Sequence, residues 1–136
     1  MPLIVERNAV MDEYARAAEQ RWVLPTFNAE NPTGLEAILA GALETARRLE
    51  LPNLPVIVGL TNQYWHRPQT LYYSCTRDWR VGLKRFMGDV GVLCGEGAPF
   101  ADLQVMVHLD HIQWDADAEL LEWDMAQFSS IMYDAS

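Results

Sequence analysis

The sequence contains very little lysine and very little cysteine. Lys84 is the only lysine among ten basic residues, which stand against 19 acidic ones, and the formal net charge is −9 at pH 7. A chain this acidic repels the phosphate backbone of nucleic acids, so we expect no nucleic-acid partner. The two cysteines, Cys75 and Cys94, form neither a CxxC pair nor a disulfide framework. Their scarcity favours a reducing, cytoplasmic location.

Long hydrophobic runs are also missing. No segment approaches the ~18 consecutive apolar residues of a membrane span, and residues 1–10 lack the basic start and apolar stretch of a secretory signal. We therefore expect a soluble protein with no membrane partner. Half of the 136 residues are apolar and 21% are charged, which is typical of a globular chain. The length predicts a single domain over residues 1–136.

Strand-like and helix-like segments alternate along the chain. Buried apolar runs predict strands near 22–28, 55–61, 103–109 and 129–134. Helical spacing predicts helices that begin near Val10, at Asn31-Pro32, at Asp78 and at Asp115, the last continuing to Met125. The aromatic-rich segment 62–77 has no clean period and is predicted to be a loop.

This order implies right-handed crossovers and a parallel sheet. Four β/α units amount to half of an eight-stranded barrel. The predicted fold is therefore α/β, a TIM-barrel-type half-barrel of four parallel strands with a preceding helix. A doubly wound open sheet is the alternative, but no glycine-rich GxGxxG turn follows the first strand. The half-barrel interior is expected to be lined by Phe27, Val58 and Val107.

Polar residues collect where the predicted strands end. Asn28 and Thr61 end the first two strands, the sequence His108-Leu-Asp110-His111 ends the third, and Asp134 with Ser136 ends the fourth. In parallel β/α proteins the carboxyl ends of strands form the functional face. Each residue alone is a common cap or turn residue, but their repetition at four strand ends favours a site.

His108, Asp110 and His111 form the most specific cluster in the sequence. A neutral imidazole is a common zinc ligand, and a nearby carboxylate can move protons. Two histidines cannot complete a catalytic zinc site, which takes three protein ligands, so a metal here needs partners from elsewhere. His66 is predicted to lie on the surface.

The remaining acidic residues after His111 are interpreted as the solvated face of a helix. None of them is taken as a site candidate; they are Asp115, Asp117, Glu119, Glu122 and Asp124.

Four segments together resemble the first four strands of the class II, metal-dependent ketose-bisphosphate aldolases. They are LPTFNAEN (24–31), PVIVGLT (55–61), VMVHLDH (105–111) and FSSIMYDAS (128–136). The HLDH motif followed by SxMxDxS is the most specific part of the match. The resemblance implies a TIM barrel, and it implies reversible aldol cleavage of a ketose bisphosphate, fructose 1,6-bisphosphate or tagatose bisphosphate. The products would be dihydroxyacetone phosphate and glyceraldehyde 3-phosphate, and the setting would be glycolysis or related carbohydrate metabolism.

The same resemblance implies roles for individual residues. His111 matches a zinc ligand, and Asp110 matches the aspartate that moves the proton on the aldehyde-derived hydroxyl. Asp134 matches a fourth-strand aspartate that in some members contacts a second metal. Asn28 and Thr61 match residues at the substrate. His108 is expected to support the others.

The length departs most from the family pattern. The family's other zinc histidines, its phosphate loops and its monovalent-cation site come from strands five to eight, so we expect an N-terminal half that is inactive alone. It is expected to pair as a homo-oligomer or with a complementing C-terminal half. Two alternatives stay open: another metal-dependent TIM-barrel enzyme such as a hydrolase, and a non-catalytic half-barrel interaction or assembly module.

Overall fold

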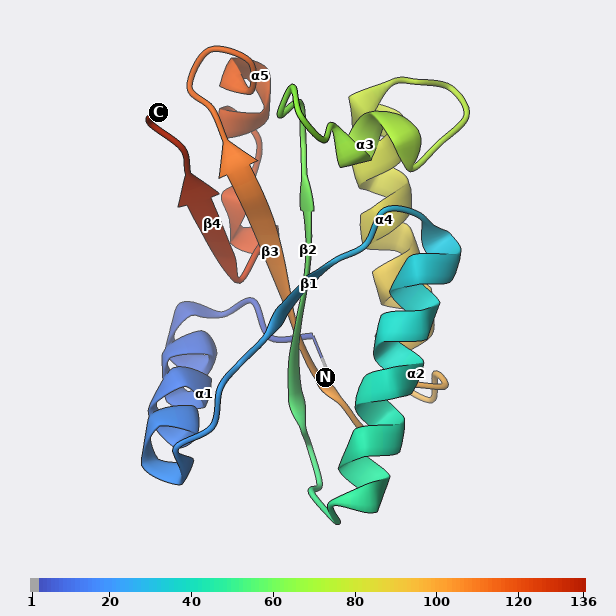
Figure 1. The fold of residues 1–136 in the computed structure, drawn as a ribbon, viewed down its shortest axis with the longest axis vertical. Coiled ribbons are helices and arrows are strands. Elements are labelled where there is room, and N and C mark those ends of the chain that lie inside the picture. Colours follow the sequence, from blue (N-terminus) through green and yellow to red (C-terminus); the bar gives the residue numbers. More distant parts are fainter. Residues whose placement is uncertain (1–2) are drawn as a thin grey trace.

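Most helices and strands lie where the sequence predicts them, and Figure 1 shows them in a computed structural model that describes residues 3–136. In chain order the elements are α1 (Arg7–Gln20), β1 (Thr26–Asn28), α2 (Pro32–Arg48), β2 (Pro55–Thr61), α3 (Gln69–Tyr72), α4 (Trp79–Cys94), β3 (Gln104–Ile112), α5 (Ala118–Leu121), the 3-10 turn η1 (Met125–Gln127) and β4 (Ser130–Tyr133). Two predicted caps start their helices. The Asn31 side chain accepts the Gly34 N–H at 2.8 Å, and Asp78 accepts the Arg80 N–H at 2.9 Å.

The four strands form one parallel sheet in the order β1-β2-β3-β4. This sequential order confirms the predicted parallel half-barrel, because a doubly wound sheet reverses its strand order at a switch point. Short parallel pairing between Leu3 and Val105 extends the sheet beside the first part of β3, where β4 does not reach.

The two faces of the sheet are covered by different helices (Figure 1). Val58 and Val107 belong to the main core, together with apolar residues of α2 and α4. Ile57 and Met106 point to the opposite face, where they pack with Val10 of α1. Successive side chains of a strand alternate between the faces, so the two sets of residues occupy opposite sides.

The expectation that Phe27, Val58 and Val107 line the barrel interior is therefore wrong. Val58 and Val107 face the helices, and Phe27 is in register with Val58 and borders an apolar groove against α2. The side chains of the alternate residues form the interior face.

Several predicted elements differ in extent. The third strand continues to Ile112 rather than ending near residue 109, and α1 begins at Arg7 rather than near Val10. The first strand covers Thr26–Asn28 rather than 22–28, and the short helix α3 lies inside the predicted loop. The predicted helix after Asp115 is interrupted: α5 begins after Asp117, ends at Leu121, and is followed by a separate 3-10 turn. Asp115 is therefore no helix cap.

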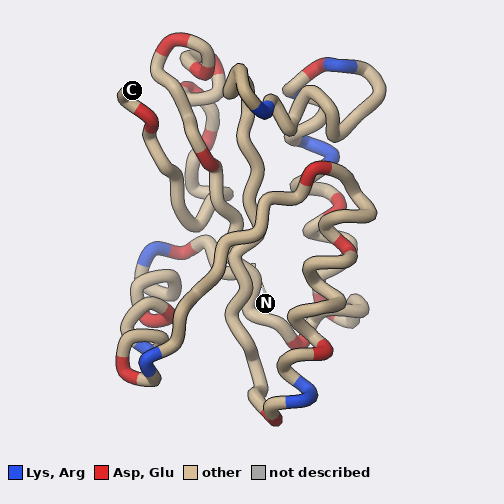
Figure 2. Tube along the Cα trace, in the orientation of Figure 1, with Lys and Arg blue, Asp and Glu red and all other residues tan. Residues whose placement is uncertain are grey.

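Charged residues lie mainly on helices and loops, and strand segments are uncharged except for Asp110 near the carboxyl end of β3 (Figure 2). Within the described residues, no helix combines the length and hydropathy needed to cross a bilayer.

Candidate functional site

The carboxyl ends of the strands bring most of the predicted residues together on the interior face. The register aligns Asn28 of β1, Gly59 of β2, His108 of β3 and Ser130 of β4 in one row across the sheet. Two residues further along, Thr61 is aligned with Asp110.

Gly59 leaves room for the Asn28 side chain to reach across β2. The Asn28 amide Nδ2 donates to Asp110 Oδ2 at 2.8 Å, so the hydrogen bond joins the first strand to the third. A Cβ atom at residue 59 would lie 3.0 Å from Asn28 Oδ1 and 3.0 Å from the His108 carbonyl oxygen. A side chain at residue 59 would therefore crowd the Asn28 side chain where it contacts Asp110.

His111 occupies an irregularity in β3. Its φ of 49° lies in the left-handed region, and the β3–β4 register shifts between Leu109 and Ile112. Such a bulge re-aims one side chain out of the strand alternation. His111 Nδ1 lies 3.0 Å from Asp134 Oδ2, and its Nε2 lies 4.0 Å from Asp110 Oδ1. The bulge therefore places the imidazole between the Asp110 carboxylate of β3 and the Asp134 carboxylate after β4.

His108 supports this arrangement from within the sheet. Its Nδ1 lies 2.8 Å from Ser130 Oγ, and its Nε2 lies 3.9 Å from Asp110 Oδ1. Burial lowers the pKa of the His108 imidazole, and this effect exceeds the opposing influence of Asp110. Burial therefore favours the neutral form of the ring.

Asp134 is kept ionised by its neighbours. The pKa of its carboxyl is lowered to about 2, first by hydrogen bonds from the Ser136 hydroxyl and N–H and then by His111. The Ser136 hydroxyl lies 2.6 Å from Asp134 Oδ1, which leaves Oδ2 to the imidazole. A carboxylate in this state can fix the orientation of a histidine ring.

Thr61 does not turn its hydroxyl toward this cluster. The side chain is buried, its hydroxyl donates to the Arg67 carbonyl oxygen, and its N–H donates to Gln69 Oε1 at 2.9 Å. The structure thus places Thr61 at the base of the β2–α3 loop. His66, in that loop, is exposed as predicted.

Two residues that sequence reasoning did not select complete the surroundings. Tyr64 stacks on His111, with ring centroids 4.4 Å apart and ring planes 9° apart. Asp117 is fully buried, contrary to its interpretation as a solvated acid, and accepts hydrogen bonds from Asn62 Nδ2 and from the Gln63 and Gln113 N–H groups. The only sequence signal for Asp117 is its place just before a short helix, which does not distinguish it from its exposed neighbours.

Comparison with known proteins identifies the family. The family model described as fructose-bisphosphate aldolase class-II matches residues 8–136. The chain belongs to this family. No curated protein matches it. The crystal structure of fructose-bisphosphate aldolase from Campylobacter jejuni superposes with a TM-score of 0.67 at 22% sequence identity, over 98% of this chain and 38% of that chain. The family resemblance and the half-barrel fold are both confirmed, and the chain spans 38% of the length of that aldolase.

Class II aldolases are generally metal-dependent, and the residues present fit one ligand position. Since the His111 Nδ1 edge faces the Asp134 carboxylate, Nε2 is the nitrogen left for a metal, an arrangement typical of metal-binding histidines. Among residues 3–136, no three His, Cys, Asp or Glu side chains are grouped so that they could hold an ion. These residues therefore fit a part of a metal site and not a complete one.

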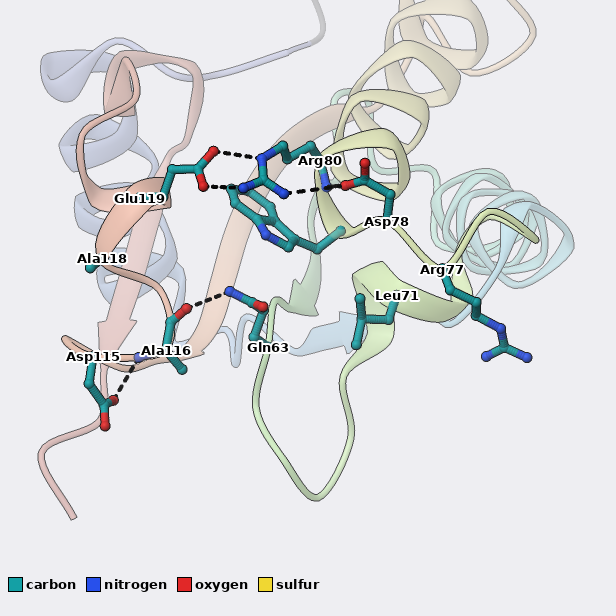
Figure 3. Close-up of a pocket in the computed structure, with 10 residues that line it drawn as sticks. Gln63, Leu71, Arg77, Asp78, Arg80, Asp115, Ala116, Ala118 and Glu119 are labelled. Carbon is teal, nitrogen blue, oxygen red and sulfur yellow. Dashed lines mark hydrogen bonds and ion pairs between the residues drawn. The ribbon is translucent and has the colours of Figure 1, made fainter.

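A separate cavity of about 710 Å³ lies between the β2–α3 loop, the start of α4 and the segment around α5 (Figure 3). Arg80 pairs there with both Glu119 oxygens and with Asp78, and these acids raise the pKa of its guanidinium. Because these charges are mutually paired and no predicted site residue lines this cavity, it is not the candidate site.

Proposed function

We propose that this chain forms the N-terminal half of a class II aldolase barrel that reversibly cleaves a ketose bisphosphate. The substrate would be fructose 1,6-bisphosphate or tagatose bisphosphate, and the products dihydroxyacetone phosphate and glyceraldehyde 3-phosphate. The observation that carries the proposal is the convergence of Asp110, His111 and Asp134 at the carboxyl end of the sheet in a chain of this family. A cytoplasmic location goes with this proposal.

Asp110 is the proposed proton-transferring residue. Its Oδ2 accepts the Asn28 amide at 2.8 Å, so the carboxylate has a fixed orientation, and its Oδ1 faces the two histidines. Aldol cleavage begins with removal of a proton from a hydroxyl group, which a positioned carboxylate can accept. We assign Asn28 the task of holding Asp110 in addition to contacting substrate, and Thr61 remains a predicted substrate contact.

His111 is the proposed ligand of a catalytic Zn²⁺ ion through Nε2. When bound, the metal would act as a Lewis acid that stabilises the enediolate oxygen. Asp134 would hold the His111 ring, and its predicted contact with a second metal stays a prediction. The alternative chemistry, a Schiff base, needs an amine at the site. Lys84, the only lysine, lies on α4 away from the strand ends.

The rest of the site would come from further β/α units. An apolar groove of about 720 Å³ lies along edge strand β1 and α2, and the chain matches only 38% of the Campylobacter jejuni aldolase. We propose that this groove receives the complementing half of the barrel. Such units would also supply the missing metal and phosphate ligands.

The test is an assay of fructose and tagatose bisphosphate cleavage by the chain joined to four further β/α units of a class II aldolase. We expect activity that a strong chelator abolishes and Zn²⁺ restores. Asp110→Asn should lower kcat by ~10²–10⁴-fold, the usual contribution of a general base. Glu122→Ala, at an exposed acid that follows α5, serves as the control. Activity that survives chelation, or that survives His111→Ala, would contradict the proposal.

A non-catalytic assembly module is the second candidate, because the described residues hold no three-ligand group. A chain that turns over neither sugar after completion of its barrel, and binds no metal at His111, would favour that role.

A further inference from the structure

Tyr64 lies flat against the imidazole that the proposed function assigns to the metal. The two rings are nearly parallel, and the Tyr64 side chain is half-buried. Asp134 contacts the same imidazole at its Nδ1 edge. A hydrogen bond at one ring atom leaves the imidazole free to swing about that contact, whereas a stacked ring restrains its plane. The two contacts together determine where Nε2 points.

The first half of the β2–α3 loop is attached to the β3–α5 segment by Asp117. Its Oδ1 accepts Asn62 Nδ2 at 2.8 Å and the Gln63 N–H at 3.3 Å. Both donors immediately precede Tyr64 in the chain. A fully buried carboxylate with these partners leaves the entry to the loop little freedom.

The second half of the loop is closed by backbone contacts. The Tyr64 carbonyl oxygen accepts the Arg67 N–H at 3.0 Å, and the Thr61 hydroxyl donates to the Arg67 carbonyl oxygen. Tyr64 is therefore carried on a short loop that is fixed before and after it. The loop presents an aromatic face to His111, and the ring rather than the hydroxyl makes the contact.

We propose that Tyr64 is a positioning residue for His111, which fixes the imidazole plane and thereby the direction of Nε2. The proposal rests on the proposed function for its consequence, metal binding, but the contact itself exists without metal. It predicts that phenylalanine at residue 64 still restrains the His111 ring, whereas an aliphatic residue of similar size does not.

The direct test is NMR of the metal-free chain with ¹³C-labelled imidazole rings, recorded at about pH 8, above the ordinary histidine pKa of ~6.5. The chain has three histidines, so His111→Ala assigns one set of signals. Protons over the face of an aromatic ring are shifted upfield. We expect Tyr64→Ala and Tyr64→Leu to remove that shift from the His111 ring protons, and Tyr64→Phe to keep it.

Tyr64→Leu separates loss of the aromatic ring from loss of packing, because leucine fills much of the same space without a ring. Tyr72→Ala is the matched control, since this exposed tyrosine contacts Arg77 and not His111. Unchanged His111 signals in Tyr64→Leu would overturn the proposal, and so would an equal change in Tyr72→Ala.

Zn²⁺ titration of the same signals provides the second readout. Aromatic stacking energies imply that Tyr64→Ala and Tyr64→Leu need ~2- to ~12-fold more Zn²⁺ for half-maximal change at His111. Equal Zn²⁺ affinity in all variants would overturn the positioning role. Zn²⁺ that leaves His111 unchanged in every variant would count against the proposed function, and the metal-free shifts would still decide the role of Tyr64.

Discussion

At the scale of single residues, the site depends on side chains that cross from one strand to another. Asn28 reaches Asp110 over Gly59, and His111 reaches Asp134 across a bulge. These contacts tie β1, β3 and the segment after β4 at one edge of the sheet. Small changes at the crossing points are therefore expected to affect both stability and the orientation of the carboxylates.

Gly59→Ala tests the crossing directly. The new methyl group would meet a backbone oxygen of β3 and the Asn28 side chain, each at 3.0 Å, and overpacking of this kind costs ~1–3 kcal/mol. We expect the free energy of unfolding, measured with urea, to fall by that amount. Gly88→Ala in α4 is the control, because its methyl group would meet nothing within 4 Å and should stabilise the helix by ~0.4–1 kcal/mol. Equal stability of Gly59→Ala and the wild type would refute the crowding at β2.

His108 predicts a pH dependence of stability. Its pKa is lowered in the folded chain from the ordinary value of 6.5, chiefly by burial, so the unfolded chain binds the proton more readily. The stability that the neutral His108 side chain contributes to the folded chain is fully present above pH 6.5, the ordinary histidine pKa. This stability is lost as the pH falls below 6.5 and through the lower pKa of the folded chain. Urea unfolding at several pH values should show a shallower loss of stability on acidification in His108→Gln. Identical slopes in the two chains would contradict the neutral, buried imidazole.

The place of the candidate residues at the carboxyl ends of the strands could be predicted from sequence, but their detailed surroundings could not. Asp110, His111 and Asn28 end apolar strands, and that pattern is visible in one sequence. The bulge at His111 and the stacking of Tyr64 depend on the packing of segments far apart in the chain. Alternation alone cannot reveal a residue in the left-handed conformation.

At the scale of elements, capped helices and buried strands are predictable because local chemistry specifies them. Asn31-Pro32 starts α2, Asp78 starts α4, and the uninterrupted apolar run of β2 gives its exact bounds. β1 is shorter than predicted because the residues before Thr26 do not pair with β2. The predicted helix after Asp115 fails because the chain there turns around the buried Asp117 instead.

Asp117→Ala tests the attachment between the β2–α3 loop and the β3–α5 segment. Removal of the carboxylate leaves three buried or half-buried N–H donors without an acceptor. Each unsatisfied donor costs ~1–3 kcal/mol of stability. We expect the free energy of unfolding to fall by at least about 3 kcal/mol and amide exchange to accelerate at Gln63 and Gln113. Glu122→Ala, an exposed acid nearby, should leave both measurements unchanged. Normal protection at Gln63 in Asp117→Ala would show that the loop is held by other contacts.

At the scale of the whole molecule, the sheet presents two edges and an apolar groove. Among residues 3–136, β1 and β4 each pair with one strand only. Phe27 beside the groove is 45% exposed, and Tyr133 on β4 is 54% exposed. A closed barrel has no such edges. Apolar burial is worth ~25 cal/mol per Å², so a few hundred Å² left open forfeits several kcal/mol, which is comparable with total domain stability.

The isolated chain is therefore expected to associate through these edges. Size-exclusion chromatography with light scattering should show a mass above 15.5 kDa that rises with concentration. Phe27→Asp places a charge on the groove beside β1 and should shift the chain toward monomer. Val92→Asp is the matched control, because Val92 is 75% exposed on α4 and does not line the groove. A stable monomer at every concentration, holding one Zn²⁺ tightly, would show that the half-barrel needs no complement, because its open edges would then cost too little to drive pairing.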